Sequence, residues 1–450
     1  MAFLTLTPVR LIGTLLCTLS AMFCMNAESA TKKPNIIIFL ADDLGYGELG
    51  CQGYIKEIPT PHVDSIAQGG IRFTQGYIAA TYCSPSRAGL MTGRYPTRFG
   101  HEFNGNGPGF GLPLSETTMA ERLKALGYVT CAVGKWHLGD QPDLYPTRRG
   151  FDEYMGCLAN PGSYYQPRQW NDSLGKITPG KDFYTTEAFA DRAVDWIERN
   201  KDRPFFLYLP FNAEHAPLHA TEKYLARFPD IKDERRRTFA AILSAMDEAI
   251  GRVLAKVREI GAEDNTLIVF FSDNGGPTPN TTSSNGPLHG FKATTSEGGT
   301  RIPYLMSWKG RLPAGKVYEL PVMQLDLLPT LVAAAGGTVD PSWKLDGVNL
   351  MPYLTGQNKG RPHQTLYWRF GEQWAIRDGD WKLVASRVDN NKPRLINLAQ
   401  DIGEANDLSS AEPQKFAQLM AKWKEWNAEQ KPALWGGESA RKKKARDDDD

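Results

Sequence analysis

The chain has 450 residues, with 52 Lys and Arg against 51 Asp and Glu, and its formal net charge is +1. This length suits one large domain with a smaller one. The near-neutral charge gives no indication of nucleic acid or a membrane surface as a partner, and the composition is that of a globular protein with abundant tryptophan.

The N-terminal residues 1–29 have the features of a secretory signal peptide. Arg10 precedes an apolar run from Leu11 to Phe23, and Ala27-Glu28-Ser29 offers a cleavage site between small residues. The run is too short to cross a membrane. Phe23 is bulky where a lipoprotein signal carries a small residue, which argues against a lipid anchor at Cys24. We therefore expect a periplasmic or secreted protein with no membrane span.

Four apolar runs in the first part of the chain predict buried β-strands, and they cover residues 35–40, 129–133, 205–209 and 267–271. Between the last two runs, apolar residues from Phe239 to Val257 recur at a spacing of three and four, which predicts an amphipathic helix. Strands alternating with helices indicate an α/β fold, with a large, mostly parallel sheet covered by helices on both faces.

The pattern changes at about residue 361. Short strands are predicted over 366–369, 373–377 and 381–384, with a hairpin turn at Asp378-Gly379, and a helix is predicted over 413–430. We expect a catalytic domain over 30–360, a C-terminal subdomain with a small antiparallel sheet packed on a helix over 361–435, and a disordered charged tail over 436–450.

Cys83 begins a segment that is expected to open a helix. Pro85 suits a first helical turn, so Cys83 lies where free backbone N–H groups form an anion site. Once the signal peptide is removed, Cys51, Cys131 and Cys157 are the other cysteines. Their spacing resembles neither a disulfide framework nor a zinc site, and both a single bridge among them and three free thiols are compatible with the sequence.

Polar side chains follow each of the four predicted strands. In order along the chain, they are Asp42 and Asp43, then Lys135 and His137, then His215, then Asp273 and Asn274. Because ligands bind beyond the carboxyl ends of parallel strands, we expect these side chains to meet at one rim of the sheet.

The acidic members of this set indicate a metal site. Asp42, Asp43, Asp273 and Asn274 offer only oxygen donors, which suit a hard divalent cation such as Ca²⁺ or Mg²⁺ better than zinc. Three carboxylates clustered without a cation would raise one another's pKa.

The segment from Cys83 to Gly93 resembles the signature of the type I sulfatases in its opening Cys-x-Pro-Ser-Arg and its closing Thr-Gly. Further segments typical of this family lie at 36–44, 134–139, 272–275, 290–303 and 374–383. The resemblance implies an arylsulfatase-like α/β/α fold of the alkaline phosphatase superfamily. It also implies oxidation of Cys83 to Cα-formylglycine by a formylglycine-generating or anaerobic sulfatase-maturating enzyme.

Carried over position by position, the resemblance assigns roles to the rim residues. Asp42, Asp43, Asp273 and Asn274 would hold the ion, commonly Ca²⁺, together with the aldehyde hydrate derived from Cys83. The residues that would hold this hydrate are Arg87, Lys135 and His137, while Lys135 and Lys292 would bind the sulfate oxygens. One hydroxyl of the hydrate would attack sulfur, and the other would then lose its proton, for which His137 is the candidate base, and expel sulfate. His215 is the candidate acid for the leaving alcohol.

The alcohol side is expected to be a sulfated carbohydrate, since an exported, tryptophan-rich enzyme without an anchor fits work on sulfated glycans. Candidate contacts in loops near the motifs are Arg98, His101, Asn104, Tyr164, Tyr165, Trp170 and His289. Trp368, Trp374 and Trp381 are expected to be core of the small sheet. The motifs specify neither the sugar nor the oligomeric state.

Two other functions are compatible with the same motifs. One is a formylglycine-dependent phosphodiester or phosphonate hydrolase of the same fold. The other is a non-catalytic protein that binds sulfated glycans, although such a protein would not need Cys83 together with Lys135, His137 and Lys292. A two-zinc phosphatase is disfavoured, because Asn274 stands where such enzymes place a histidine.

Overall fold

The computed structural model describes residues 1–4 and 32–436. Residues 5–31, which hold most of the expected signal peptide, and the charged tail after Gly436 lie outside the described residues. Among the helices that are described, none combines the length and the apolar character needed to cross a membrane.

The centre of the structure is a ten-stranded sheet with the order β10-β2-β8-β7-β1-β6-β3-β4-β5, and β9 pairs with β2 at its side. Its strands are β1 (Asn35–Ala41), β2 (Ile71–Tyr77), β3 (Val129–Lys135), β4 (Glu153–Cys157), β5 (Trp170–Asp172), β6 (Phe205–Pro210), β7 (Thr266–Ser272), β8 (Arg301–Ser307), β9 (Lys316–Tyr318) and β10 (Val322–Met323). The central strands β7, β1, β6, β3 and β4 run parallel, whereas β8 is antiparallel to both of its neighbours. The predicted mostly parallel α/β sheet is confirmed.

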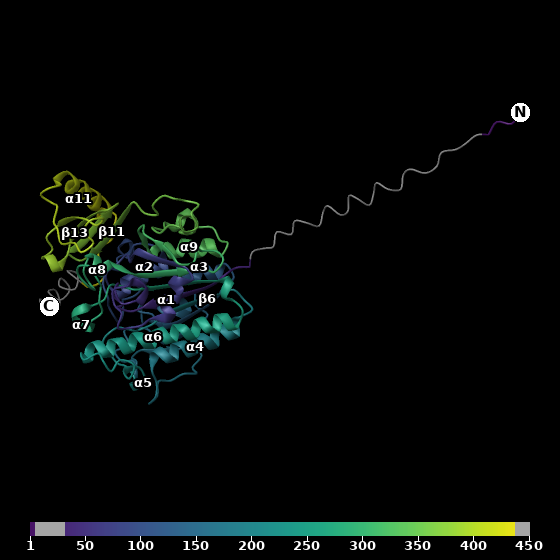
Figure 1. The fold of residues 1–450 in the computed structure, drawn as a ribbon, viewed down its shortest axis with the longest axis horizontal. Helices are drawn as coiled ribbons and strands as arrows, with labels where there is room; N and C mark the ends of the chain where they lie inside the picture. Colours follow the sequence, from purple (N-terminus) through teal and green to yellow (C-terminus); the bar gives the residue numbers. More distant parts are fainter. Residues whose placement is uncertain (5–31, 437–450) are drawn as a thin grey trace. The chain divides into compact units, whose positions relative to one another are not determined.

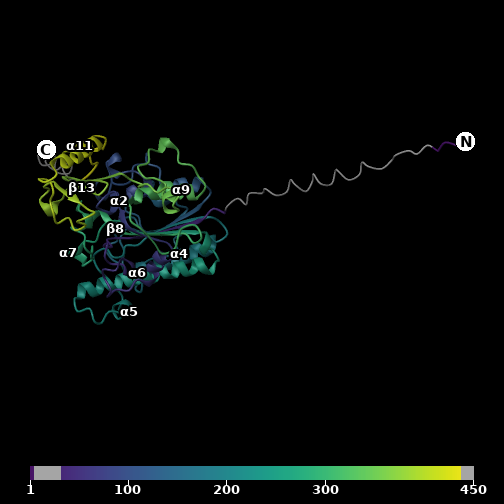
Figure 2. The same cartoon turned by 45° about the horizontal axis from the view of Figure 1, so that its top comes forward.

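Helices cover both faces of this sheet (Figures 1 and 2). One face carries α1 (Pro61–Gln68), α4 (Thr185–Asn200), α5 (Glu222–Leu225) and α6 (Glu234–Glu259), and the other carries α2 (Cys83–Thr92), α3 (Met119–Ala125) and α9 (Leu327–Ala334). In β1, Ile37 and Phe39 pack into the core beneath α4 and α6, whereas Ile36 and Ile38 pack into the core beneath α2 and α3. This alternation explains the uninterrupted apolar run, because both faces of the strand are buried.

Apart from α11, the remaining elements are short. The other helices are α7 (Thr278–Thr281), α8 (Glu297–Thr300), α10 (Met351–Leu354) and α11 (Pro413–Ala428). Single 3₁₀ turns occur at η1 (Gly50–Gln52), η2 (Pro96–Phe99), η3 (Pro142–Leu144), η4 (Pro146–Arg148), η5 (Glu263–Asn265), η6 (Gln324–Asp326), η7 (Pro341–Trp343) and η8 (Arg387–Asp389).

A second, four-stranded antiparallel sheet follows, built from β11 (Thr365–Phe370), β12 (Gln373–Asp378), β13 (Trp381–Ala385) and β14 (Arg394–Asn397). Gly379 has a φ of +62° in the turn between β12 and β13, as the predicted hairpin requires. Trp368 is fully buried, and Trp374 packs on Trp423 of α11 with ring centroids 4.5 Å apart. Both sheets belong to one compact unit that begins at Pro34, so the domain boundary expected at residue 360 stays a prediction.

The cysteines and the surface agree with the sequence analysis. Cys51, Cys131 and Cys157 are all free, so the alternative without a bridge is the one that the described residues show.

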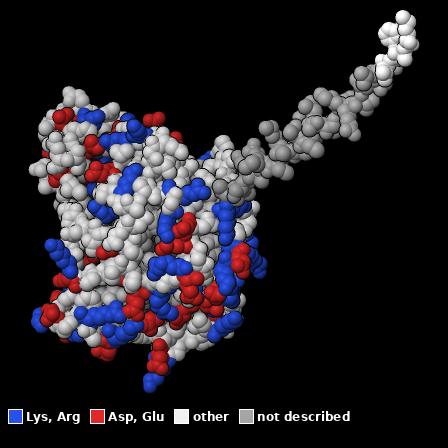
Figure 3. Space-filling view, turned by 45° about the vertical axis from the view of Figure 1, so that its right-hand side comes forward, with Lys and Arg blue, Asp and Glu red and all other residues white. Residues whose placement is uncertain are grey.

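On the face drawn in Figure 3, basic side chains lie among acidic ones, in keeping with the near-neutral net charge.

The second sheet is joined to the first by buried charges. Lys382 of β13 reaches Glu297 of α8 at 2.8 Å and Glu404 at 3.0 Å, and none of these three side chains is more than 1% exposed. Because two carboxylates share one ammonium group, the cluster depends on that group for its charge balance.

Replacing Lys382 by Met should therefore lower the free energy of unfolding by about 3–5 kcal/mol, since it leaves the buried Glu404 without its ion-pair partner and Glu297 with only Arg301. Lys424→Met, on the exposed side of α11, is the matched control and should change it by less than about 0.5 kcal/mol. Denaturant unfolding followed by tryptophan fluorescence measures both. Equal stability of the two variants would contradict this role of Lys382.

Candidate active site

The carboxyl ends of β1 and β7 bring two polar pairs together. Ala41 is the register partner of Ser272, so Asp42 and Asp43 leave β1 beside Asp273 and Asn274. The backbone N–H of Asp43 donates to Asp273 Oδ1 at 3.2 Å, and Asn274 Nδ2 donates to Asp43 Oδ1 at 2.7 Å. All four side chains are buried. The structure thus places the four predicted oxygen donors in one cluster.

Helix α2 delivers Cys83 to this cluster. Tyr82 precedes the helix in an extended conformation, and Cys83 is its first residue and is fully buried. Its Sγ lies 3.6 Å from Asp42 Oδ1 and 3.2 Å from Lys292 Nζ. Burial raises the pKa of the Cys83 thiol to about 12, against the lowering effect of Lys135 and Lys292. An unmodified thiol here is protonated at neutral pH and is a poor nucleophile.

The donor set fits a hard divalent cation. Ligand atoms of Asp42, Asp43, Cys83 and His215 all lie within 4.8 Å of one another. Asn274 Oδ1 is buried and has no hydrogen-bond partner among the described residues, which is unusual for a buried amide oxygen unless a ligand completes it. Carboxylate and amide oxygens are the ligands that Ca²⁺ and Mg²⁺ prefer.

Three cationic side chains, Arg87, Lys135 and Lys292, balance the carboxylates. Arg87 Nη2 lies 2.8 Å from Asp273 and 3.3 Å from Asp42, and Lys135 Nζ lies 2.5 Å from Asp42. Burial alone would raise the pKa of Asp42, but the charges of Lys135, Arg87 and Lys292 together lower it. Burial raises the pKa of Asp273, and the neighbouring charge of Asp42 adds to this effect. The carboxyl groups of Asp42 and Asp273 therefore differ in how readily they ionise. An added cation would favour the form in which both are ionised.

His137 lies on the loop that follows β3. Its backbone has a φ of +59°, and its carbonyl oxygen accepts a hydrogen bond from Ser84 Oγ at 2.7 Å. Burial lowers the pKa of the imidazole, with a further lowering by Lys135 and Arg87, so the ring is neutral at pH 7 and can accept a proton. Glycine is required at position 134, just before this loop, because a Cβ there would lie 1.8 Å from Pro210 O.

His215 approaches from the loop after β6. Its Nδ1 lies 2.5 Å from Ala216 O, and since a carbonyl only accepts, Nδ1 carries the proton of the neutral ring. Nε2 then faces Asp43 Oδ2 at 3.8 Å. Burial lowers the pKa of His215, and Lys135 lowers it further.

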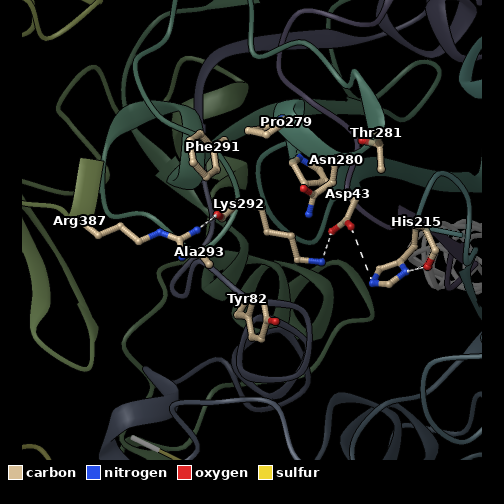
Figure 4. A pocket seen from close by; sticks show the side chains of 12 residues that line it. Asp43, Tyr82, His215, Pro279, Asn280, Thr281, Phe291, Lys292, Ala293 and Arg387 are labelled. Carbon is tan, nitrogen blue, oxygen red and sulfur yellow. Dashed lines mark hydrogen bonds and ion pairs between the residues drawn. The ribbon is translucent and has the colours of Figure 1, made fainter. Parts of the chain in front are cut away.

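Of these groups, Asp43 and His215 line a pocket of about 480 Å³ (Figure 4). Lys292 crosses it, and its Nζ reaches Asp43 Oδ1 at 2.6 Å. The lining residues are Asp43, Tyr82, His215, Ala216, Pro277, Pro279, Asn280, Thr281, Phe291, Lys292, Ala293 and Arg387.

None of the seven residues expected to bind the alcohol belongs to this lining. The guanidinium of Arg98 is bound to Asp346 at 2.6 Å, and His101 is fully buried with its Nε2 2.6 Å from Ser84 Oγ. Trp170 donates to Ile177 O, and its ring stacks on a core phenylalanine. His289 lies 3.3 Å from Asp389. These partners hold the side chains in structural contacts.

The other three predicted contacts also have partners within the protein. Asn104 Oδ1 accepts a hydrogen bond from Ser84 N at 2.9 Å, and the Tyr164 hydroxyl donates to His215 O at 3.0 Å. Tyr165 stacks on His219.

Sequence reasoning missed Tyr82, Phe291 and Arg387 as pocket residues. Tyr82 directly precedes Cys83, and Phe291 directly precedes Lys292. Because the motifs single out Cys83 and Lys292, this adjacency could have indicated that Tyr82 and Phe291 lie near the site. Arg387 has no such signal, because it comes from the second sheet, far away in the sequence.

Comparisons with known proteins agree with this geometry. Residues 34–337 match the family described as Sulfatase, and residues 290–431 match the family described as N-sulphoglucosamine sulphohydrolase, C-terminal. Arylsulfatase G of Rattus norvegicus is 33% identical, covering 89% of this chain and 87% of its own length. N-acetylgalactosamine-6-sulfatase of Homo sapiens is also 33% identical, covering 86% and 84%.

A solved structure shares the fold at higher similarity. The crystal structure of Ps i-CgsB in complex with k-i-k-neocarrahexaose has a TM-score of 0.84 and 36% identity, and the match covers 90% of this chain and 95% of that one. Family match, relatives and fold agree along almost the whole described chain. The protein therefore belongs to the sulfatase family and is a sulfuric ester hydrolase.

Proposed function

We propose that this enzyme is exported and releases inorganic sulfate from sulfated carbohydrates, using a formylglycine at position 83 and a divalent cation. The carbohydrate class is supported by the name of the human N-acetylgalactosamine-6-sulfatase and by the oligosaccharide in the Ps i-CgsB complex. The observation that carries the proposal is the position of Lys292, which lines the pocket. Its Nζ contacts both Cys83 Sγ and Asp43.

The residue at position 83 and the cation supply the reactive chemistry. Asp42, Asp43, Asp273 and Asn274 would hold Ca²⁺ or Mg²⁺, which neutralises an anionic ester and lowers the pKa of a nearby hydroxyl. Oxidation of Cys83 to formylglycine by a separate maturation enzyme would supply an aldehyde hydrate in place of a thiol that stays protonated at neutral pH.

The chain's own cations bind the sulfate group. Burial would lower the pKa of Lys292, but Asp43 and the other nearby anionic groups raise it, so Lys292 keeps its charge. Lys292 lines the pocket and Lys135 is buried against Asp42, and the two ammonium groups would bind the sulfate oxygens. Arg87 fixes the carboxylates through Asp273 and Asp42. Fixed charge of this kind favours a transition state in which negative charge develops.

The two histidines are suited to different proton transfers. His137 is buried and neutral, so it can accept a proton from a hydroxyl at position 83. His215 keeps its Nδ1 proton on Ala216 O, and a proton bound at Nε2 could pass to the leaving alcohol oxygen. An anionic substrate would raise the pKa of His215 and favour this doubly protonated form.

Replacing Cys83 by Ala should lower kcat about 10³-fold or more, because the nucleophile is lost. Cys51→Ala, at a half-buried thiol outside the site, is the control and should keep wild-type turnover. Mass spectrometry of the active enzyme should show the mass of an aldehyde or its hydrate at position 83. An intact thiol in fully active protein would overturn the proposal.

Calcium at 100 times its Kd should stabilise the chelator-treated enzyme by about 2.7 kcal/mol, because the ion binds only the folded site. Asp43→Asn should abolish this rise in Tm, whereas Asp202→Asn, in an exposed turn after α4, should retain it. Differential scanning calorimetry measures the effect without any substrate. An unchanged calcium response in Asp43→Asn would remove Asp43 from the cation site.

Replacing His215 by Ala should lower kcat/KM about 10²- to 10⁴-fold on sulfated sugars, whose alkoxide leaving group needs a proton. The loss on 4-nitrophenyl sulfate should be much smaller, because nitrophenolate leaves unaided. His219→Ala, on a nearby histidine that stacks on Tyr165 outside the pocket, serves as the control. Equal losses on the two substrates would exclude His215 as the acid.

A further inference from the structure

The wall of the pocket nearest the second sheet carries an arginine that has no carboxylate partner. Arg387 is the first residue of η8, directly after β13, and its side chain is exposed. It forms no ion pair with any of the residues that the structure describes. Its guanidinium lies against Phe291, with Cζ 5.4 Å from the ring centroid, and Nη2 donates to Lys292 O at 3.2 Å.

These two contacts fix the guanidinium in place and leave most of it free to bind. A guanidinium has five N–H donors, and Lys292 O takes one of them. The face of Phe291 and the carbonyl oxygen restrict the side chain before any ligand arrives, so little conformational freedom remains to be lost on binding. A fixed planar fork of donors matches the oxygens of a sulfate or a carboxylate.

Nearby acidic groups are already engaged. Asp389, two residues away, is bound by Arg394 at 2.9 Å and lies 3.3 Å from His289. Asp43, across the pocket, is bound by Lys292 at 2.6 Å. The charge of Arg387 is therefore not cancelled within the described structure, and it faces the pocket (Figure 4).

Lys292 sets the separation between Arg387 and the reaction centre. The carbonyl oxygen of Lys292 accepts from Arg387, while its Nζ lies 3.2 Å from Cys83 Sγ. The two anion-binding points are thus separated by about one extended lysine side chain. Neighbouring substituents on a sugar ring, or on two linked rings, can span such a distance. Tyr82 and Phe291 also line the pocket, and each ring packs against one of these two cationic side chains, Tyr82 against Lys292 and Phe291 against Arg387.

Building on the proposed function, we propose that Arg387 determines specificity by binding a second oxyanion of the substrate, a sulfate ester or a carboxylate on the same or the adjacent sugar. The enzyme would then prefer saccharides that carry an additional anionic group beside the sulfate that it removes.

The test compares matched saccharides. Galactose and N-acetylgalactosamine oligosaccharides with one sulfate would be paired with otherwise identical ones that carry a second sulfate, or a uronate carboxylate, on the same or the adjacent ring. For wild type, kcat/KM should be about tenfold higher on at least one doubly anionic member, mainly through KM. Comparison of the sulfate and carboxylate arms identifies which group Arg387 binds.

Arg387→Gln should remove this preference, so its loss on the doubly anionic member exceeds its loss on the singly sulfated one by about tenfold. Arg387→Lys, which keeps the charge without the fork, should retain part of it. Arg311→Gln is the matched control, because Arg311 is also an exposed arginine over an aromatic ring, outside the pocket, and it should leave all rates unchanged. Added NaCl should weaken the preference of the wild type for the doubly anionic member, whereas Arg387→Gln has no such preference to lose.

The outcomes separate the two proposals. Equal losses on both members of a pair would show that Arg387 only supports Lys292, and would overturn the specificity role. The absence of any preference in the wild type would overturn it as well. If the wild type released sulfate from none of the saccharides while hydrolysing 4-nitrophenyl sulfate, the carbohydrate proposal itself would fall, and the inference with it.

Discussion

Charge balance in the interior is the constraint on which this site depends. Asp42, Asp43 and Asp273 are buried together, where like charges repel strongly and each would favour its neutral form. Arg87 and Lys135 contact Asp42 directly, and Arg87 bridges it to Asp273. Removing one cation would leave a buried carboxylate uncompensated, which costs more than the pair contributes when intact.

The second sheet completes this site. Its Lys382 is held between Glu297 and Glu404, and Trp368 Nε1 donates to Ile78 O at the end of β2. Glu297 belongs to α8, a few residues after Lys292 in the sequence. The buried contacts that attach the second sheet therefore also fix the segment that carries Lys292. Arg387 reaches the pocket from the same attachment, so one wall of the pocket comes from each sheet.

Much of this could be predicted from the sequence, because the signals are local. The apolar runs gave the central strands, and residues directly after strand ends, such as Asp42 and Asn274, had to meet at one edge of a parallel sheet. The antiparallel position of β8 was not predictable, since strand order depends on packing between distant segments. Arg98 and His101 were chosen for residue type and proximity to motifs, whereas the structure gives each an internal partner. Arg387 could not be predicted because it is far from the motifs in the sequence, and only the attachment of the second sheet brings it near Lys292.

The burial of Cys83 has a consequence for the order of events during biosynthesis. The side chain has no exposed surface, its helix is packed on one face of the large sheet, and Lys292 lies against its sulfur. Under the proposed function, a maturation enzyme would have to bring its own catalytic groups to that sulfur, which requires the segment to be accessible in an unfolded conformation. Under the proposed function, oxidation must therefore take place on the nascent or unfolded chain, and a molecule that folds first would be permanently inactive.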